Sequence, residues 1–123
     1  MTRPLALVFY GNLLPGSQLV NRLQDLGYRV QAIGDVRTLV VQAVQEKPLV
    51  VVTDLAASVD VCPVIRELKK NPETKHIPVI AFSNMKDGRL PAAAMASGAT
   101  LVAGGGAILD QLPELLEQAL RVE

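Results

Sequence analysis

Residues 47–55 read Lys-Pro-Leu-Val-Val-Val-Thr-Asp-Leu, and this stretch decides the fold class. Its central run, Leu49–Thr53, is almost entirely apolar and rich in β-branched residues. The run is too short for a helix, and a strand with apolar residues at successive positions is typical of a sheet that is buried on both faces. The sequence therefore predicts a parallel sheet covered by helices, with Asp54 at the carboxyl end of one strand.

Four further segments have the composition of strands. Three of them are short apolar runs of the same kind: Leu5–Tyr10, Pro78–Phe82 and Thr100–Ala103. In the remaining one, Tyr28–Ile33, Arg29 and Gln31 alternate with apolar residues. We therefore expect Tyr28–Ile33 to be an edge strand, with Arg29 and Gln31 on its wetter face.

Between these strands, apolar residues recur at the three- and four-residue spacing of amphipathic helices. This spacing covers residues 19–26, 36–44, 61–68 and 109–120. Gly27 and Gly98 are suited to the left-handed residue just past a helix end, and Asp110 and Pro113 are suited to the start of the last helix. Strands and helices thus alternate five times, which predicts one domain over residues 1–123. The expected architecture is a doubly wound, flavodoxin-like three-layer α/β/α fold with a five-stranded parallel sheet in the order 2-1-3-4-5.

The composition of the chain restricts its function. The 123 residues include 12 basic and 12 acidic ones, so the formal net charge is zero. This balance argues against a nucleic-acid or membrane-binding surface and leaves little electrostatic barrier to self-association. The single cysteine, Cys62, excludes an internal disulfide and suits a reducing compartment, and no apolar run approaches the roughly 20 residues of a membrane span. We expect a cytoplasmic protein.

In a doubly wound sheet, ligands bind at the carboxyl ends of the strands. The residues expected there are Tyr10, Gly11 and Asn12 after the first strand, Asp54 after the third, Ser83 and Asn84 after the fourth, and Gly104–Gly106 after the fifth. They include no nucleophile–base pair, no paired carboxylates and no P-loop, so a metabolic enzyme is not expected.

Four stretches of the chain resemble the receiver domains of response regulators, the CheY-like family. They are Gly-Tyr-Arg-Val at 27–30, the 47–55 stretch that ends in Asp-Leu, His-Ile-Pro-Val-Ile-Ala-Phe-Ser at 76–83, and Ala-Ser-Gly-Ala at 96–99. The resemblance covers essentially the whole chain. It implies the flavodoxin-like fold and a role in two-component signalling.

The resemblance also implies a site, and this chain matches only part of it. Asp54 corresponds to the aspartate that receivers phosphorylate, and Ser83 to the hydroxyl that bonds the phosphoryl group. The acidic pair that helps such domains hold Mg²⁺ corresponds to Tyr10 and Gly11, or to Gly11 and Asn12, and the lysine that neutralises the phosphoryl charge corresponds to Gly105. Mg²⁺ usually takes one or two protein carboxylates, so we expect Mg²⁺ binding to be lost or weak and no cofactor to be required.

Three functions follow from this partial match. The first is a degenerate receiver, or pseudo-receiver, that binds protein partners without phosphorylation. The second is a working phosphoacceptor that uses Asp54. The third is a small-ligand sensor in which Gly104–Gly106 and Asn12 bind an anion or metabolite. A bland interpretation of the glycines is a slack loop where lysine and proline are missing.

Residues 91–103 suggest where a partner would bind. The expected helix Pro91–Ser97 contains no charged residue, and neither does the adjoining edge strand Thr100–Ala103. In receivers, the face formed by the fourth helix, fifth strand and fifth helix commonly mediates dimerisation. We expect a protein partner, or a second copy of the chain, to contact Ala93, Ala94, Met95, Leu101 and Val102.

The one histidine, His76, lies in a basic segment with Lys69, Lys70 and Lys75. We interpret this segment as a solvated edge of the protein and His76 as a surface residue of a loop.

Overall fold

The computed structural model describes residues 4–10, 13–55, 61–83 and 89–121. The elements follow one another as β1 (Leu5–Phe9), α1 (Leu13–Asp25), β2 (Arg29–Ile33), the short 3₁₀ helix η1 (Val36–Thr38), α2 (Leu39–Glu46), β3 (Val50–Asp54), α3 (Cys62–Lys70), β4 (Val79–Ser83), α4 (Arg89–Ser97), β5 (Leu101–Gly104), α5 (Gly105–Asp110) and α6 (Leu112–Arg121). Within the described ranges, no helix has the length and hydropathy needed to cross a bilayer.

The strands form one parallel sheet in the order β2-β1-β3-β4-β5. Both the fold class and the strand order predicted from the sequence are confirmed. The register aligns the carboxyl ends of the central strands, because Phe9 pairs with Thr53, Asp54 with Phe82 and Ser83 with Gly104.

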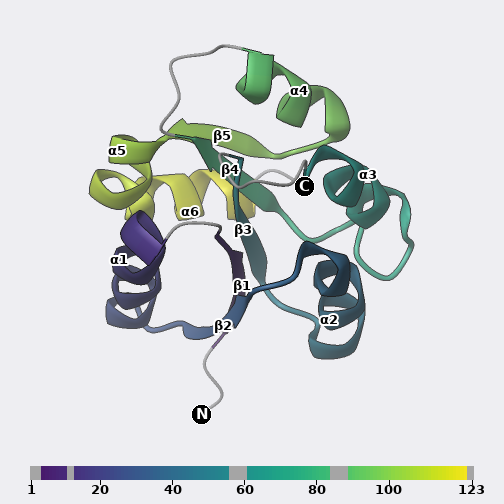
Figure 1. The fold of residues 1–123 in the computed structure, drawn as a ribbon. Coiled ribbons are helices and arrows are strands. Elements are labelled where there is room, and N and C mark those ends of the chain that lie inside the picture. Colours follow the sequence, from purple (N-terminus) through teal and green to yellow (C-terminus); the bar gives the residue numbers. More distant parts are fainter. Residues whose placement is uncertain (1–3, 11–12, 56–60, 84–88, 122–123) are drawn as a thin grey trace.

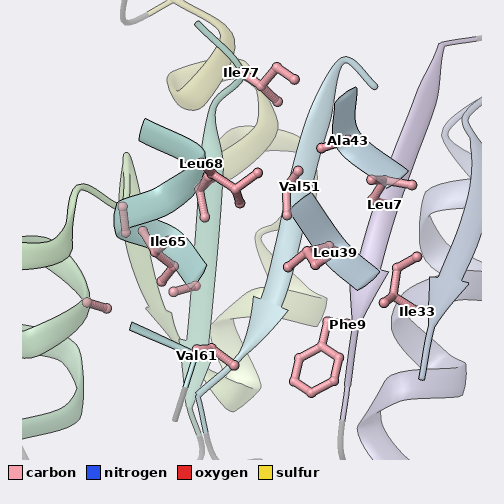
Figure 2. Close-up of a cluster of buried hydrophobic side chains, with 14 of the residues drawn as sticks. Leu7, Phe9, Ile33, Leu39, Ala43, Val51, Val61, Ile65, Leu68 and Ile77 are labelled. Atoms are coloured by element: carbon pink, nitrogen blue, oxygen red, sulfur yellow. The ribbon is translucent and has the colours of Figure 1, made fainter. Parts of the chain in front are cut away.

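Side chains of successive residues alternate between two cores, one on each face of the sheet. Leu7, Phe9 and Val51 pack beneath α2 and α3, as Figure 2 shows. Val8, Val52 and Phe82 pack against α1, α5 and α6 on the opposite face. In Figure 1 these two groups of helices flank the sheet, and α4 lies beside β5 at one end. The continuous apolar runs of the sequence are explained by this burial on both faces.

Two helix ends form as the glycines indicate. Gly27 follows α1 with φ +94°, and Gly98 follows α4 with φ +112°. Position 98 requires glycine for a second reason, because a Cβ there would lie 2.8 Å from Lys69 Cγ. The stem of Lys69 therefore packs directly on the backbone of the α4–β5 connection.

The structure corrects the expectation for β2. This strand is at an edge of the sheet, and Arg29 is exposed as expected. Gln31, however, is half-buried and its amide donates to Gln42 Oε1 of α2 at 2.8 Å, while Ala32 is exposed. Gln31 lies on the face covered by α2, so its half-buried amide has a hydrogen-bonding partner from that helix.

The carboxyl-terminal part of the chain also differs from expectation. Gly104 ends β5, and Gly105 begins a helix, so the glycines do not form a slack loop. Asp110 ends α5 instead of capping the last helix, which begins after Gln111. Burial of Ile108 in α5 and Leu112 in α6 offsets the conformational cost of helical glycine.

Candidate functional site

Asp54 is the last residue of β3 and lies at the carboxyl end of the sheet, where β1, β4 and β5 also end. Phe9 pairs with Thr53, so Tyr10 follows β1 at the level of Asp54. Alternation places Asp54 on the same face as Val50 and Val52, and the half-buried ring of Tyr10 packs against that core as well. The fold thus brings Tyr10 and Asp54 to one end of the sheet.

The carboxyl group of Asp54 is closed off from solvent. The residue is 2% exposed, its strand partner Phe82 is 1% exposed, and the next backbone amide, Leu55 N–H, donates to Phe82 O at 2.8 Å. Asp54 also makes an interaction within the fold. Asp54 is therefore part of the packed carboxyl end of the sheet.

Thr53 faces the opposite core and is fully buried. Among the described residues its Oγ1 has no hydrogen-bonding partner. A buried hydroxyl without a partner lowers stability, which makes Thr53 an exception to the general pairing of buried polar groups in proteins.

Of the remaining predicted site residues, the structure describes Ser83 and Gly105. Ser83 ends β4 and pairs with Gly104 through the backbone, and Gly105 begins α5. Gly11, Asn12 and Asn84 lie outside the described residues. At the described ends of β1, β3, β4 and β5, the one carboxylate is that of Asp54, and no cluster of three metal-ligating side chains occurs in the described ranges.

The predicted partner face is partly corrected. Met95 is 52% exposed, and Ala93 is exposed, as a contact surface requires. Ala94, in contrast, is 0% exposed and belongs to the core beneath α3, so it is not a surface residue. Leu101 and Val102 of β5 are half-buried. Helix α4 begins at Arg89, so it contains one charged residue that the expected range excluded.

A second polar region was missed by the sequence interpretation. Lys69 of α3 is half-buried instead of solvated, and its ammonium group donates to Ile77 O at 2.9 Å. Burial lowers the pKa of the Lys69 ammonium. The signal for this was present at Gly98, whose missing side chain makes room for Lys69, although the sequence alone does not pair the two residues.

This doubly wound architecture is that of the flavodoxin-like class. No model of a known protein family matches the sequence, and no curated protein is similar to it. Solved structures do resemble it, and those described next are all receiver domains or CheY-like regulators.

The receiver domain of a Pseudomonas aeruginosa sensor histidine kinase, a structure with a magnesium ion coordinated in its active site cleft, has a TM-score of 0.87 and 18% identity over 98% of this chain and 99% of that one. The chemotaxis protein CheY4 of Vibrio cholerae has a TM-score of 0.84 and 18% identity over 97% and 100% of the two chains. The receiver domain of a Syntrophus aciditrophicus histidine kinase has a TM-score of 0.83 and 20% identity over 96% and 90%. The chain therefore has the receiver-domain fold.

Proposed function

We propose that this protein is a pseudo-receiver of two-component-type signalling, a module that binds protein partners without being phosphorylated. The single observation that carries the proposal is the state of Asp54. The resemblance to receivers implies that Asp54 corresponds to their phosphoacceptor, but it is 2% exposed and is the one carboxylate at the described ends of the central strands.

The charge at this site supports the proposal. A phosphoryl group adds a charge of about −1.5 to −2 at neutral pH. The resemblance implies two carboxylates at Tyr10 and Gly11, or at Gly11 and Asn12, and a lysine at Gly105, so neither a carboxylate ligand for Mg²⁺ nor a fixed cation is supplied from these positions. Without such groups, the charge that develops during phosphoryl transfer lacks stabilisation. These residues do not fit a resident Mg²⁺ ion, and we assign no catalytic step to the protein.

The exposed part of α4 and the neighbouring edge strand β5 support binding by protein contact. The exposed residues of α4 between 92 and 96 are alanines and Met95, and none is charged. β5 pairs with β4 on one side and forms an edge of the sheet on the other. An uncharged edge strand beside the uncharged exposed residues of α4 between 92 and 96 lacks the charges that usually discourage pairing. We refer to Ala93, Met95, Leu101 and Val102 as the α4–β5 face.

Amide NMR with added Mg²⁺ and then beryllofluoride, a phosphoryl mimic, tests the proposal. We expect no saturable shift at Thr53, Asp54 or Leu55. The Pseudomonas receiver domain, whose structure holds a magnesium ion, is the positive control for Mg²⁺ binding. Saturable shifts centred on Asp54 that disappear in Asp54→Asn would establish the alternative, a working phosphoacceptor, and overturn the proposal.

A further inference from the structure

A pocket of about 600 Å³ lies at the opposite end of the sheet from Asp54, where β4 and β5 begin. Its walls come from the last turn of α3, the α3–β4 connection and the α4–β5 connection. They are Lys69, Lys75, His76, Pro78, Gly98, Ala99 and Thr100. The size falls within the range of about 300–1,000 Å³ that is usual for small-molecule sites.

The charged side chains that line this pocket, Lys69 and Lys75, carry one sign of charge. Two lysines and the histidine line it, and no Asp or Glu does. Among the described residues, neither Lys69 nor Lys75 forms an ion pair with a carboxylate. Cations left without a counter-ion at a concave surface raise the local concentration of anions.

Lys69 is held in place before any ligand binds. Its Nζ donates to Ile77 O at 2.9 Å and to Lys75 O at 3.4 Å, and its stem rests on Gly98. An ammonium has three N–H donors, so one is left after these two carbonyls. Burial lowers the pKa of Lys69, and a bound anion would restore the stabilisation that this cation lacks.

Thr100 supplies a neutral donor beside these cations. Its Oγ1 accepts from Val79 N at 3.1 Å, which leaves the hydroxyl proton free to donate. Pro78 and Ala99 add apolar surface to the same pocket. Fixed donors and a small apolar wall are the combination that recognises an organic anion rather than a bare ion.

We propose that this pocket binds a small organic oxyanion, a phosphate monoester or a carboxylate, between Lys69, Lys75 and Thr100. The site is separate from Asp54, and the proposal is independent of the proposed function. It would make the protein responsive to a metabolite through the β4–β5 end of the sheet.

Amide NMR titration at low ionic strength with phenyl phosphate, inorganic phosphate and benzyl alcohol tests this proposal. We expect saturable shifts at His76, Gly98, Ala99 and Thr100 with phenyl phosphate, half-saturated at roughly 1 mM or below. Inorganic phosphate should bind more weakly at the same amides, and the neutral alcohol should leave them unshifted. Linear, unsaturated shifts up to roughly 20 mM phenyl phosphate would overturn the proposal.

Two lysine variants separate a site from a general charge effect. Lys75→Gln removes a pocket cation, and Lys70→Gln removes the same charge from an exposed residue of α3 that does not line the pocket. We expect Lys75→Gln to weaken phenyl phosphate binding about fivefold or more and Lys70→Gln to change it less than about twofold. Equal weakening by both variants, with folding intact, would show that only net charge matters and would contradict the proposed site.

Discussion

Two buried threonines of the described chain, Thr53 and Thr74, differ in hydrogen bonding, and replacing each hydroxyl by a methyl group measures the difference. Thr53 and Thr74 are both 0% exposed, but Thr53 Oγ1 has no partner among the described residues, whereas Thr74 Oγ1 donates to Leu68 O. Replacing an unpaired buried hydroxyl by a methyl group of similar shape removes a desolvation penalty. We expect Thr53→Val to raise the free energy of unfolding by about 1 kcal/mol.

Thr74→Val is the matched control for that prediction. It breaks a buried hydrogen bond and leaves Leu68 O without it, so we expect a loss of about 1–2 kcal/mol. Urea unfolding of both variants makes the comparison. A loss of stability in Thr53→Val would contradict the prediction and show that the hydroxyl is paired.

The two positive-φ glycines allow backbone strain to be separated from a side-chain clash. Both Gly27 and Gly98 have φ values that alanine rarely adopts, and only at Gly98 would a Cβ meet another group, Lys69 Cγ at 2.8 Å. We expect Gly27→Ala to lower the free energy of unfolding by about 1 kcal/mol and Gly98→Ala by roughly 2–4 kcal/mol.

The double variant Gly98→Ala/Lys69→Ala tests the cause of that difference. Shortening Lys69 removes the Cγ atom and leaves its Cβ 3.3 Å from the added methyl group. The cost of Gly98→Ala, measured in the Lys69→Ala protein, should therefore fall most of the way to the cost of Gly27→Ala. Chemical unfolding of the single and double variants gives all of these values. If Gly27→Ala and Gly98→Ala are equally destabilising, Lys69 does not press on the α4–β5 connection.

For single residues, the sequence predicts the place in a strand or helix better than it predicts burial. The apolar run before Asp54 places this residue at the end of β3, and the structure agrees. Its burial depends on what the neighbouring strands and Tyr10 bring to the same edge, which no local pattern contains. Lys69 is a similar case, because its burial depends on Gly98 and the α4–β5 connection, which lie far away in the sequence.

At the scale of elements, η1 is fixed by one charged pair. Asp35 Oδ1 accepts from Arg37 N at 2.9 Å and from Arg37 Nε at 3.1 Å, and Oδ2 accepts from Nη2 at 2.9 Å. The hydrogen bonds from the Arg37 side chain, and then that from its backbone, hold the pKa of Asp35 below its usual value. A carboxyl whose pKa is lower in the folded state stabilises the fold above its unfolded pKa.

We therefore expect this contribution of Asp35 to be present at neutral pH and lost as the pH falls through its folded-state pKa. In a carbon-detected NMR titration, Arg37→Gln should move the pKa of Asp35 upward. The difference in melting temperature between the two proteins should shrink in acid. An Asp35 titration that is unchanged by Arg37→Gln would show that the pair does not form in solution.

The carboxyl-terminal helices show where helix prediction stops. Leucines at the right spacing predict a single helix near residues 109–120, and α6 contains most of them. The turn at Gln111 and the helix formed by Gly105–Asp110 depend on burying Ile108 and Leu112 beside β4 and α1. Glycine has a poor helix propensity, so the local sequence opposes what tertiary packing enforces.

On the scale of the whole molecule, the sheet has two chemically different ends. At its carboxyl end, Asp54 is buried, and Gly105 stands where the resemblance to receivers implies a lysine. At its other end, Lys69, Lys75 and His76 line an open pocket without acidic residues. The parallel topology separates these two ends, because every strand runs in the same direction. All strand-to-helix connections therefore lie at the carboxyl end of the sheet, and all helix-to-strand connections lie at the amino end.

The α4–β5 face leads us to predict that the protein self-associates. If a second copy of the chain binds there, a charge at its exposed centre must be desolvated without a partner, which is costly. We expect Met95→Glu and Ala93→Glu to shift the protein toward monomer in sedimentation equilibrium, with the free energy of unfolding changed by less than about 0.5 kcal/mol.

Val41→Glu is the matched surface control, since Val41 of α2 is 53% exposed and Met95 is 52% exposed. It adds the same charge away from α4 and β5 and should leave the assembly state unchanged.

Ala94→Glu is the matched control for burial. Because Ala94 is fully buried, the introduced carboxylate would be unpaired in the core, and we expect a loss of roughly 3–5 kcal/mol in stability. Self-association through this face would be excluded if Val41→Glu and Met95→Glu weakened self-association equally, or if the protein were monomeric at every concentration. Either outcome would direct the search to a different protein partner.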